Sequence, residues 1–170
     1  MDKFYPELEK RADKGDTPYN LRNCAYMEDF FRPKVVWKRI GSILRFSYDE
    51  KGFLSLDSTC FATGKHIKFL VALLNSTMGH YLLSDAPQTG TGDLLVSVQA
   101  VEPILLPSLG PKIEKELEKL VTQVIEFQNC NRNTVNLELE IDNIIFDLYN
   151  LEIDEINFLK SVFHRSKLFQ

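Results

Sequence analysis

The stretch Pro33–Gly52, PKVVWKRIGSILRFSYDEKG, decides the fold of this 170-residue chain. It opens with three strand-forming residues and then alternates apolar and polar side chains as far as Tyr48, with one interruption at Gly41. The turn-forming residues 49–52 predict a reversal of the chain onto a further strand at 53–56. We therefore expect a β-ribbon here, and we interpret the remaining chain as the scaffold that holds it.

The ribbon is locally basic, although the whole chain has a net charge of −4. Residues 101–170 hold 7 Lys and Arg against 12 Asp and Glu, whereas residues 32–68 hold 8 against 3. A local positive field can steer a protein to phosphates whatever its total charge. The alternative is a solvated strand face whose lysines prevent edge pairing, and charge alone favours that alternative. The basic side chains within the ribbon are Lys34, Lys38, Arg39 and Arg45.

Hydrophobic periodicity predicts an α+β fold with a small, mostly antiparallel sheet packed on an amphipathic helix over residues 65–83. Two later segments with matched apolar stripes and a tight polar link predict a C-terminal antiparallel helical hairpin. We expect three regions: an N-terminal helix and connecting segment (1–32), a β-rich core (33–107), and the hairpin with a short helix (111–165). Further expected elements are a helix at 4–14, strands at 58–63 and 94–101, and helices at 111–129, 134–150 and 154–163.

Composition narrows the class of protein. The hydrophobic fraction of 44% is enough for one packed domain. No apolar run is long enough to cross a bilayer, and the N-terminus lacks the apolar stretch of a signal peptide, so we expect a cytoplasmic protein without membrane contact. Three widely separated cysteines predict free thiols and no metal-ligand pair.

A search for catalytic motifs finds no nucleophile elbow, no zinc-protease motif and no phosphate-binding loop. The acidic–lysine run at 49–51 resembles part of a metal-dependent nuclease site, but no second carboxylate is spaced to complete a metal pair. A charged turn explains that run better. We therefore expect no catalytic residue, cofactor or metal in this chain, and binding is the favoured class of function.

Five segments of the chain occur in a fixed order and spacing. They are DKGDTPYNLRNCAYMEDFFRPKVVWKRIG (13–41), the YDEKG turn (48–52), KFLVALLNSTMGHYLL (68–83), EPILLP (102–107) and EIDNIIFDLYNLEIDEI (140–156). Together they resemble one family, the TaqI-like C-terminal specificity domain of type II and type IIG restriction-modification enzymes, over roughly residues 9–159.

The resemblance implies a target recognition domain that clamps duplex DNA against a neighbouring catalytic domain. In this family the catalytic domain binds S-adenosylmethionine and methylates the N6 of a flipped adenine, and the type IIG proteins also cut DNA. Its glycine-rich cofactor loop and Asn-Pro-Pro-Tyr motif are absent from this sequence. The resemblance thus implies a recognition half that is not itself an enzyme, with DNA and an adenine methyltransferase domain as partners in bacterial defence.

We predict DNA contacts from the ribbon in the order Arg39, Arg45, Lys38. Arginine can bridge guanine O6 and N7 with two hydrogen bonds, whereas lysine serves mainly as a charge for phosphate. Lys38 and Arg39 are consecutive in one strand, so they point to opposite faces and at most one of them faces DNA directly unless the strand is an edge. We expect Trp37 to be a core residue.

Other candidate contacts lie outside the ribbon. Asn20 and Arg22 belong to a segment that the resemblance brings close to the catalytic module, although a structural ion pair explains Arg22 equally well. Gln88 and Thr89 lie in a glycine-bearing loop and could contact adenine or a thymine methyl group.

An alternative function from another class stays open. In that alternative the helical hairpin at 113–148 docks onto a partner protein, as spacer helices do in multisubunit modification systems. Charge reversal at Arg39 and Arg45 separates the two hypotheses, because only DNA binding depends on these cations.

Overall fold

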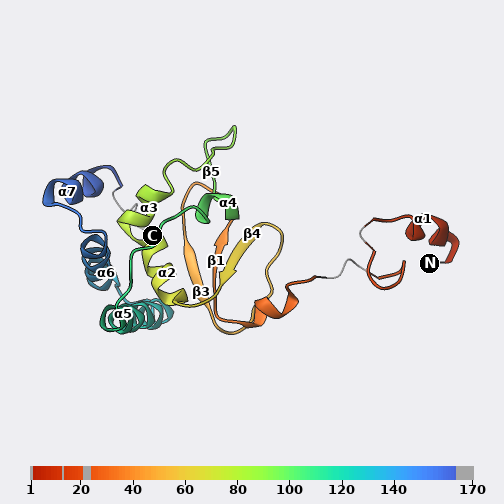
Figure 1. Cartoon of the computed structure of the whole chain (residues 1–170), viewed down its shortest axis with the longest axis horizontal. Coiled ribbons are helices and arrows are strands. Elements are labelled where there is room, and N and C mark those ends of the chain that lie inside the picture. The colour runs from red at the N-terminus through yellow and green to blue at the C-terminus, as the bar shows by residue number, and fades with distance from the viewer. Residues whose placement is uncertain (1, 13, 21–23, 164–170) are drawn as a thin grey trace.

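A computed structural model describes residues 2–12, 14–20 and 24–163 and confirms the α+β fold. A three-stranded antiparallel sheet in the order β3-β1-β4 packs on helices (Figure 1). The central strand, β1 (Lys34–Lys38), pairs with β3 (Phe46–Asp49) on one side and with β4 (Thr59–Thr63) on the other. Alternation decides which face is buried: Val35 and Trp37 are enclosed against the helices, whereas Lys38 is exposed.

The predicted strand at 53–56 is wrong, because the chain after β3 forms a loop that leads to β4. β3 instead folds back on β1 through the 42–45 loop. The reason lies in Asp49, whose carboxylate accepts hydrogen bonds from the backbone N–H groups of Lys51 (2.8 Å) and Phe53 (3.0 Å). These bonds use N–H groups that a strand would offer to a neighbour, so the turn continues as loop.

The single helix expected at 65–83 is two helices, α2 (Ile67–Asn75) and α3 (Thr77–Leu82). Ser76 separates them in an extended conformation. Its hydroxyl donates to the Leu73 carbonyl (2.6 Å) and accepts from the Gly79 N–H (3.0 Å), so it ends one helix and caps the next. Periodicity continues across the break, which is why the sequence did not reveal it.

The strand expected at 94–101 is only two residues long. β5 (Leu94–Leu95) pairs with β2 (Ile40–Gly41), and residues 98–101 form the short helix α4 (Val98–Val101). Between them Val96 is completely buried: its N–H donates to the Arg39 carbonyl (2.8 Å) and its carbonyl accepts from Trp37 Nε1 (2.8 Å). The Val96 N–H thus continues the β2–β5 pairing by one residue, whereas the Trp37 side chain takes its carbonyl, and the chain then turns into α4.

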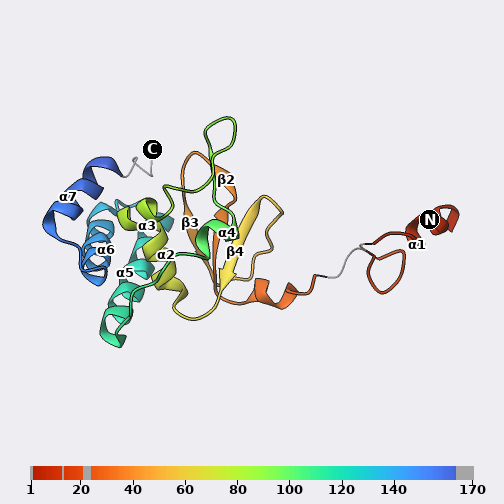
Figure 2. The same ribbon diagram turned by 45° about the horizontal axis from the view of Figure 1, so that its top comes forward.

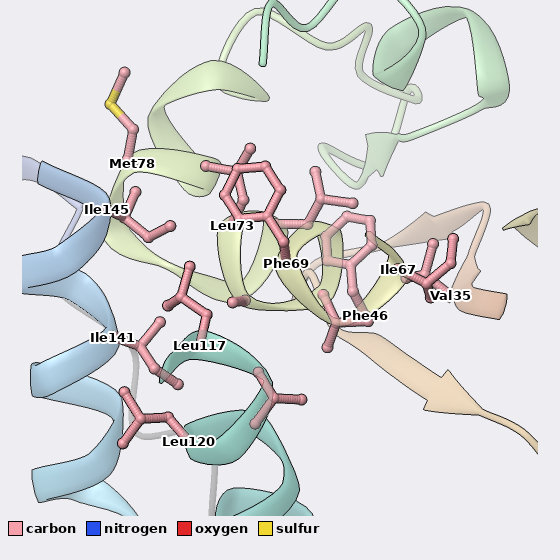
Figure 3. Close-up of a cluster of buried hydrophobic side chains, with 14 of the residues drawn as sticks. Val35, Phe46, Ile67, Phe69, Leu73, Met78, Leu117, Leu120, Ile141 and Ile145 are labelled. Carbon is pink, nitrogen blue, oxygen red and sulfur yellow. The ribbon is translucent and has the colours of Figure 1, made fainter. Parts of the chain in front are cut away.

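The C-terminal helices occur where the sequence predicted them, as α5 (Pro111–Asn129), α6 (Val135–Leu148) and α7 (Ile153–Val162). α5 and α6 form the helical hairpin, and this hairpin packs on α2 and α3 rather than on the sheet (Figures 1 and 2). The molecule is therefore layered as sheet, middle helices and outer helices. Figure 3 shows the core that joins them, in which Phe69 and Leu73 of α2 lie between the sheet residue Phe46 and the outer residues Leu117 and Ile145.

The N-terminal segment is less helical than expected. It contains the 3-10 turn η1 (Asp2–Phe4) and α1 (Tyr5–Glu9), and both views show it apart from the layered body. A second 3-10 helix, η2 (Met27–Phe31), covers part of the open face of the sheet, where the Phe30 and Phe61 rings are 4.5 Å apart.

Two further expectations concern whole-chain properties. No helix within residues 2–12, 14–20 and 24–163 is long and apolar enough to cross a bilayer. Cys24, Cys60 and Cys130 are free thiols, and Cys130 is exposed.

Candidate nucleic-acid interface

Three of the predicted DNA-contacting residues lie at one end of the sheet. The β1–β3 register pairs Trp37 with Phe46, so its continuation by one residue brings Lys38 opposite Arg45. On the other side of β1, the Arg39 N–H donates to the Ser58 carbonyl (3.0 Å), which extends the pairing with β4. Antiparallel pairing therefore gathers cations that are up to seven positions apart in the sequence.

Lys38 and Arg39 differ in exposure, as expected for neighbours on a strand. Lys38 is exposed on the open face, whereas Arg39 is half-buried and its Nε has no hydrogen-bond partner among the described residues. Within the same residues, no carboxylate forms an ion pair with either side chain. Neither charge is therefore neutralised by an ion pair with a described residue, and Lys38 is the more accessible of the two. The order of these residues as DNA contacts stays a prediction.

Arg45 is exposed but lies towards the outer helices. It lines a cavity of about 260 Å³ between β3, α2, α5 and α6, together with Gln128 and Glu138. A carboxylate in the lining of the same cavity reduces the positive potential that Arg45 contributes to the sheet end.

The glycine-bearing loop folds as a β-hairpin over residues 87–95, with the Leu95 N–H donating to the Pro87 carbonyl (2.7 Å). It continues the β2–β5 ribbon and projects beyond it in both views (Figures 1 and 2). Gln88 is exposed near its base. The Thr89 hydroxyl instead holds the turn, because it accepts from the Asp93 N–H (3.2 Å) and bonds to the Thr91 hydroxyl (2.8 Å).

Thr91, near the tip of this hairpin, is an exposed residue that the sequence reasoning missed. The alternation of threonine and glycine in TGTGD (89–93) is the signal that could have identified it, because such a run favours a tight turn with a polar tip.

The fourth basic residue of the ribbon, Lys34, is removed from the surface. Its side chain is completely buried, forms an ion pair with Asp49, and donates to the Phe30 carbonyl (2.6 Å). Burial alone would raise the pKa of the Asp49 carboxyl, but the hydrogen bonds from Lys34 and from two backbone N–H groups outweigh burial and lower the pKa. Lys34 and Asp49 therefore form a structural ion pair, and the basic surface is smaller than the sequence predicted.

Two candidates, Asn20 and Arg22, precede η2 in the sequence. Arg22 lies outside the described residues. The Asn20 side-chain oxygen accepts from the Thr17 N–H (3.0 Å) within its own turn, and that turn belongs to the segment that stands apart from the body. Asn20 thus has a local structural role in addition to any contact with DNA.

Comparison with known proteins adds no family assignment: no protein-family model matches the sequence, and no curated protein matches it. The resemblance to the TaqI-like specificity domains therefore depends on the ordered segments alone.

In the described part of the chain, no three His, Cys, Asp or Glu side chains lie close enough together to hold a metal ion. The sheet end offers cations and hydrogen-bonding groups, which can bind phosphates and base edges.

Proposed function

We propose that this chain is the DNA-recognition part of a restriction-modification enzyme with N6-adenine methyltransferase activity. One observation supports it above the others: two adjacent cations at the end of β1, Lys38 and Arg39, have no carboxylate partner among the described residues. Lysine and arginine side chains without such a partner release counterions when they meet phosphates, which favours binding. The ordered motifs that resemble TaqI-like specificity domains point to the same function.

The proposed DNA contacts are of two kinds, contacts with phosphates and contacts with base edges. Lys38, exposed on the open face, would neutralise a phosphate, and Arg45 would add a second positive charge opposite it. Gln88 lies at the base of the projecting hairpin and carries the carboxamide that pairs with adenine N6 and N7. Methylation, with S-adenosylmethionine as cofactor, would be the task of a separate catalytic domain that the resemblance implies.

The net charge of −4 and the small basic surface predict weak binding by this chain alone. In a fluorescence-anisotropy titration with a labelled duplex at low salt, we expect a dissociation constant of about 1 to 100 µM with little sequence preference. Nanomolar, sequence-selective binding would contradict the idea that a partner domain supplies much of the affinity.

A pair of matched variants tests the site itself. Lys38→Glu combined with Arg39→Gln should abolish the anisotropy change. The control, Lys112→Glu combined with Lys115→Gln, alters the net charge equally on the exposed face of α5, and it should leave binding within about twofold of wild type. If both double variants lose DNA binding equally, the loss comes from the change in net charge, and the sheet end is not the binding site.

The alternative function, docking of the helical hairpin onto a partner protein, is favoured by one feature of α6. Val135 and Leu139 lie one turn apart on the same side of this helix and are 54% and 48% exposed. Under this alternative, replacement of Lys38 and Arg39 leaves partner binding intact, whereas Leu139→Glu abolishes it.

A further inference from the structure

The outer edge of β3 is held at one position by a side chain that imitates a neighbouring strand. The Phe46 N–H donates to Asn75 Oδ1 (3.1 Å), and Asn75 Nδ2 donates back to the Phe46 carbonyl (2.7 Å). A carboxamide has the same donor and acceptor as a peptide group, so Asn75 forms the pair of bonds that a strand beside β3 would form.

Two residues further along, the same edge is open. Alternate residues of a strand direct their N–H and C=O groups to the same side, so the backbone groups of Tyr48 point outwards as those of Phe46 do. Among the described residues, none forms a hydrogen bond with the Tyr48 N–H or carbonyl. The edge therefore offers one donor and one acceptor at the spacing that an extended peptide needs.

These open groups border an apolar cavity of about 260 Å³ that also touches α2, α5 and α6. This volume is below the range of about 300 to 1,000 Å³ typical of sites for drug-sized ligands, but it has room for one or two apolar side chains. The side chains at its apolar surface are Val71, Ala72, Val121, Val124 and Ile141. An apolar pocket beside an open strand edge is the combination by which strand-adding domains select their peptides.

Charge at the Tyr48 end favours a basic peptide. The Tyr48 hydroxyl donates to Glu50 (3.0 Å), and its pKa is raised to about 12 by burial, by this hydrogen bond, and by the charges of Glu50, Glu118 and Asp49. The Asp49 carboxylate is already paired, and Lys68 lies over the ring with its Nζ 5.2 Å from the ring centroid. When the cavity lining is included, the carboxylates of Glu50, Glu118 and Glu138 outnumber the cations of Lys68 and Arg45, which attracts lysine or arginine.

We propose that the open edge of β3 and the adjoining cavity bind an extended peptide, which adds to the sheet as a strand, places an apolar side chain in the cavity and carries a lysine or arginine near Glu50. Asn75 marks the end of this site, because it already occupies the edge at Phe46. The inference does not depend on DNA binding: Arg45 lines this cavity as well as the candidate DNA site, but Lys38 and Arg39 are not among the residues that line it.

The test uses the whole chain and a phage-displayed library of random peptides of about twelve residues, which is longer than an average strand of 5–6 residues. We expect enrichment of peptides with an apolar residue two positions from lysine or arginine. N-methylation along an enriched peptide should weaken binding most at the one residue that pairs with Tyr48, because Asn75 already takes the bonds at Phe46.

Two variants then identify the site. Tyr48→Pro removes the outward N–H without removing a bond to β1, and it should bind enriched peptides at least about tenfold more weakly than Tyr48→Ala, which keeps the N–H. Val124→Phe fills the cavity from a half-buried position, whereas Glu126→Phe adds the same ring outside it and serves as control.

Failure of any peptide to enrich overturns the proposal. So does binding that is equal in Tyr48→Pro and Tyr48→Ala, or in Val124→Phe and wild type. Circular dichroism of every variant checks that it is folded.

Discussion

Replacement of Asp49 by asparagine tests the ion pair that joins β1, the turn after β3 and η2. Lys34 is 0% exposed and the Asp49 side chain 10% exposed, so removal of the carboxylate charge leaves an ammonium group enclosed in protein without a counterion. The Phe30 carbonyl remains as a hydrogen-bond acceptor at 2.6 Å but carries no full charge. Breaking a buried pair of this kind costs about 3 to 5 kcal/mol of the free energy of unfolding.

Urea denaturation of wild type and Asp49→Asn, followed by circular dichroism, measures this cost. The matched control is Asp29→Asn, which breaks the ion pair with Arg32, whose side chain is 64% exposed. Exposed pairs contribute at most about 1 kcal/mol, so the control should stay within that limit. The double variant Lys34→Met with Asp49→Asn should recover more than about 1 kcal/mol relative to Asp49→Asn, because it removes the unpaired buried charge.

The same pair has a pH dependence of defined sign. The pKa of Asp49 in the folded state lies below its ordinary value of 3.8, so its contribution to stability is present above that value and is lost as the pH falls through the folded-state pKa. The gap between wild type and Asp49→Asn should therefore be constant above pH of about 5 and should narrow below pH of about 4. A cost of Asp49→Asn below about 1 kcal/mol, or a gap that widens in acid, would refute the buried-pair argument.

Two further predictions concern Gly79 and Tyr48. A Cβ atom at Gly79 would lie 2.1 Å from the Leu73 carbonyl oxygen, so Gly79→Ala should lower the free energy of unfolding by about 3 kcal/mol in a urea titration. The control is Gly90→Ala, because a Cβ atom there meets nothing within 4 Å. It should change the free energy of unfolding by less than about 0.5 kcal/mol. The raised pKa of Tyr48 predicts a phenol that ionises near pH 12 in an ultraviolet titration and is missing in Tyr48→Phe. Since this value exceeds the ordinary 10.0, the stabilisation by Tyr48 is complete below pH 10 and is lost as the pH rises towards 12; ionisation of every tyrosine near pH 10 would contradict it.

The candidate interface shows how far residue type can predict position. The sequence identified a basic ribbon, and β1 (Lys34–Lys38) lies at the start of the predicted stretch. It could not separate Lys34 from Lys38, because both have the same side chain and face the same side of one strand. Lys34 is covered by η2 and paired with Asp49, whereas Lys38 lies at the uncovered end. The residues next to a side chain in the sequence do not show whether a distant segment will cover it in the fold.

The open edge of β3 was also beyond sequence reasoning. Asn75 reads as one polar residue in an amphipathic helix, and nothing local indicates that its carboxamide pairs with a strand 29 positions earlier. Residues 53–56 are mostly apolar, as in many strands, yet the Asp49 carboxylate accepts a hydrogen bond from the N–H of Phe53 and the segment forms a loop. Hydrogen bonds between side chains and backbone across the fold decided both outcomes.

By itself the sequence determined the α+β class, the central strand and the three C-terminal helices, because these depend on periodicity and on residues such as Pro111 that act within a few positions. Only the tertiary structure decided which strands pair, where α2 ends, and which cations stay in water. Those outcomes depend on groups that are far apart in the chain and meet only when it folds. The sequence of any single segment therefore does not determine the free energy of these contacts.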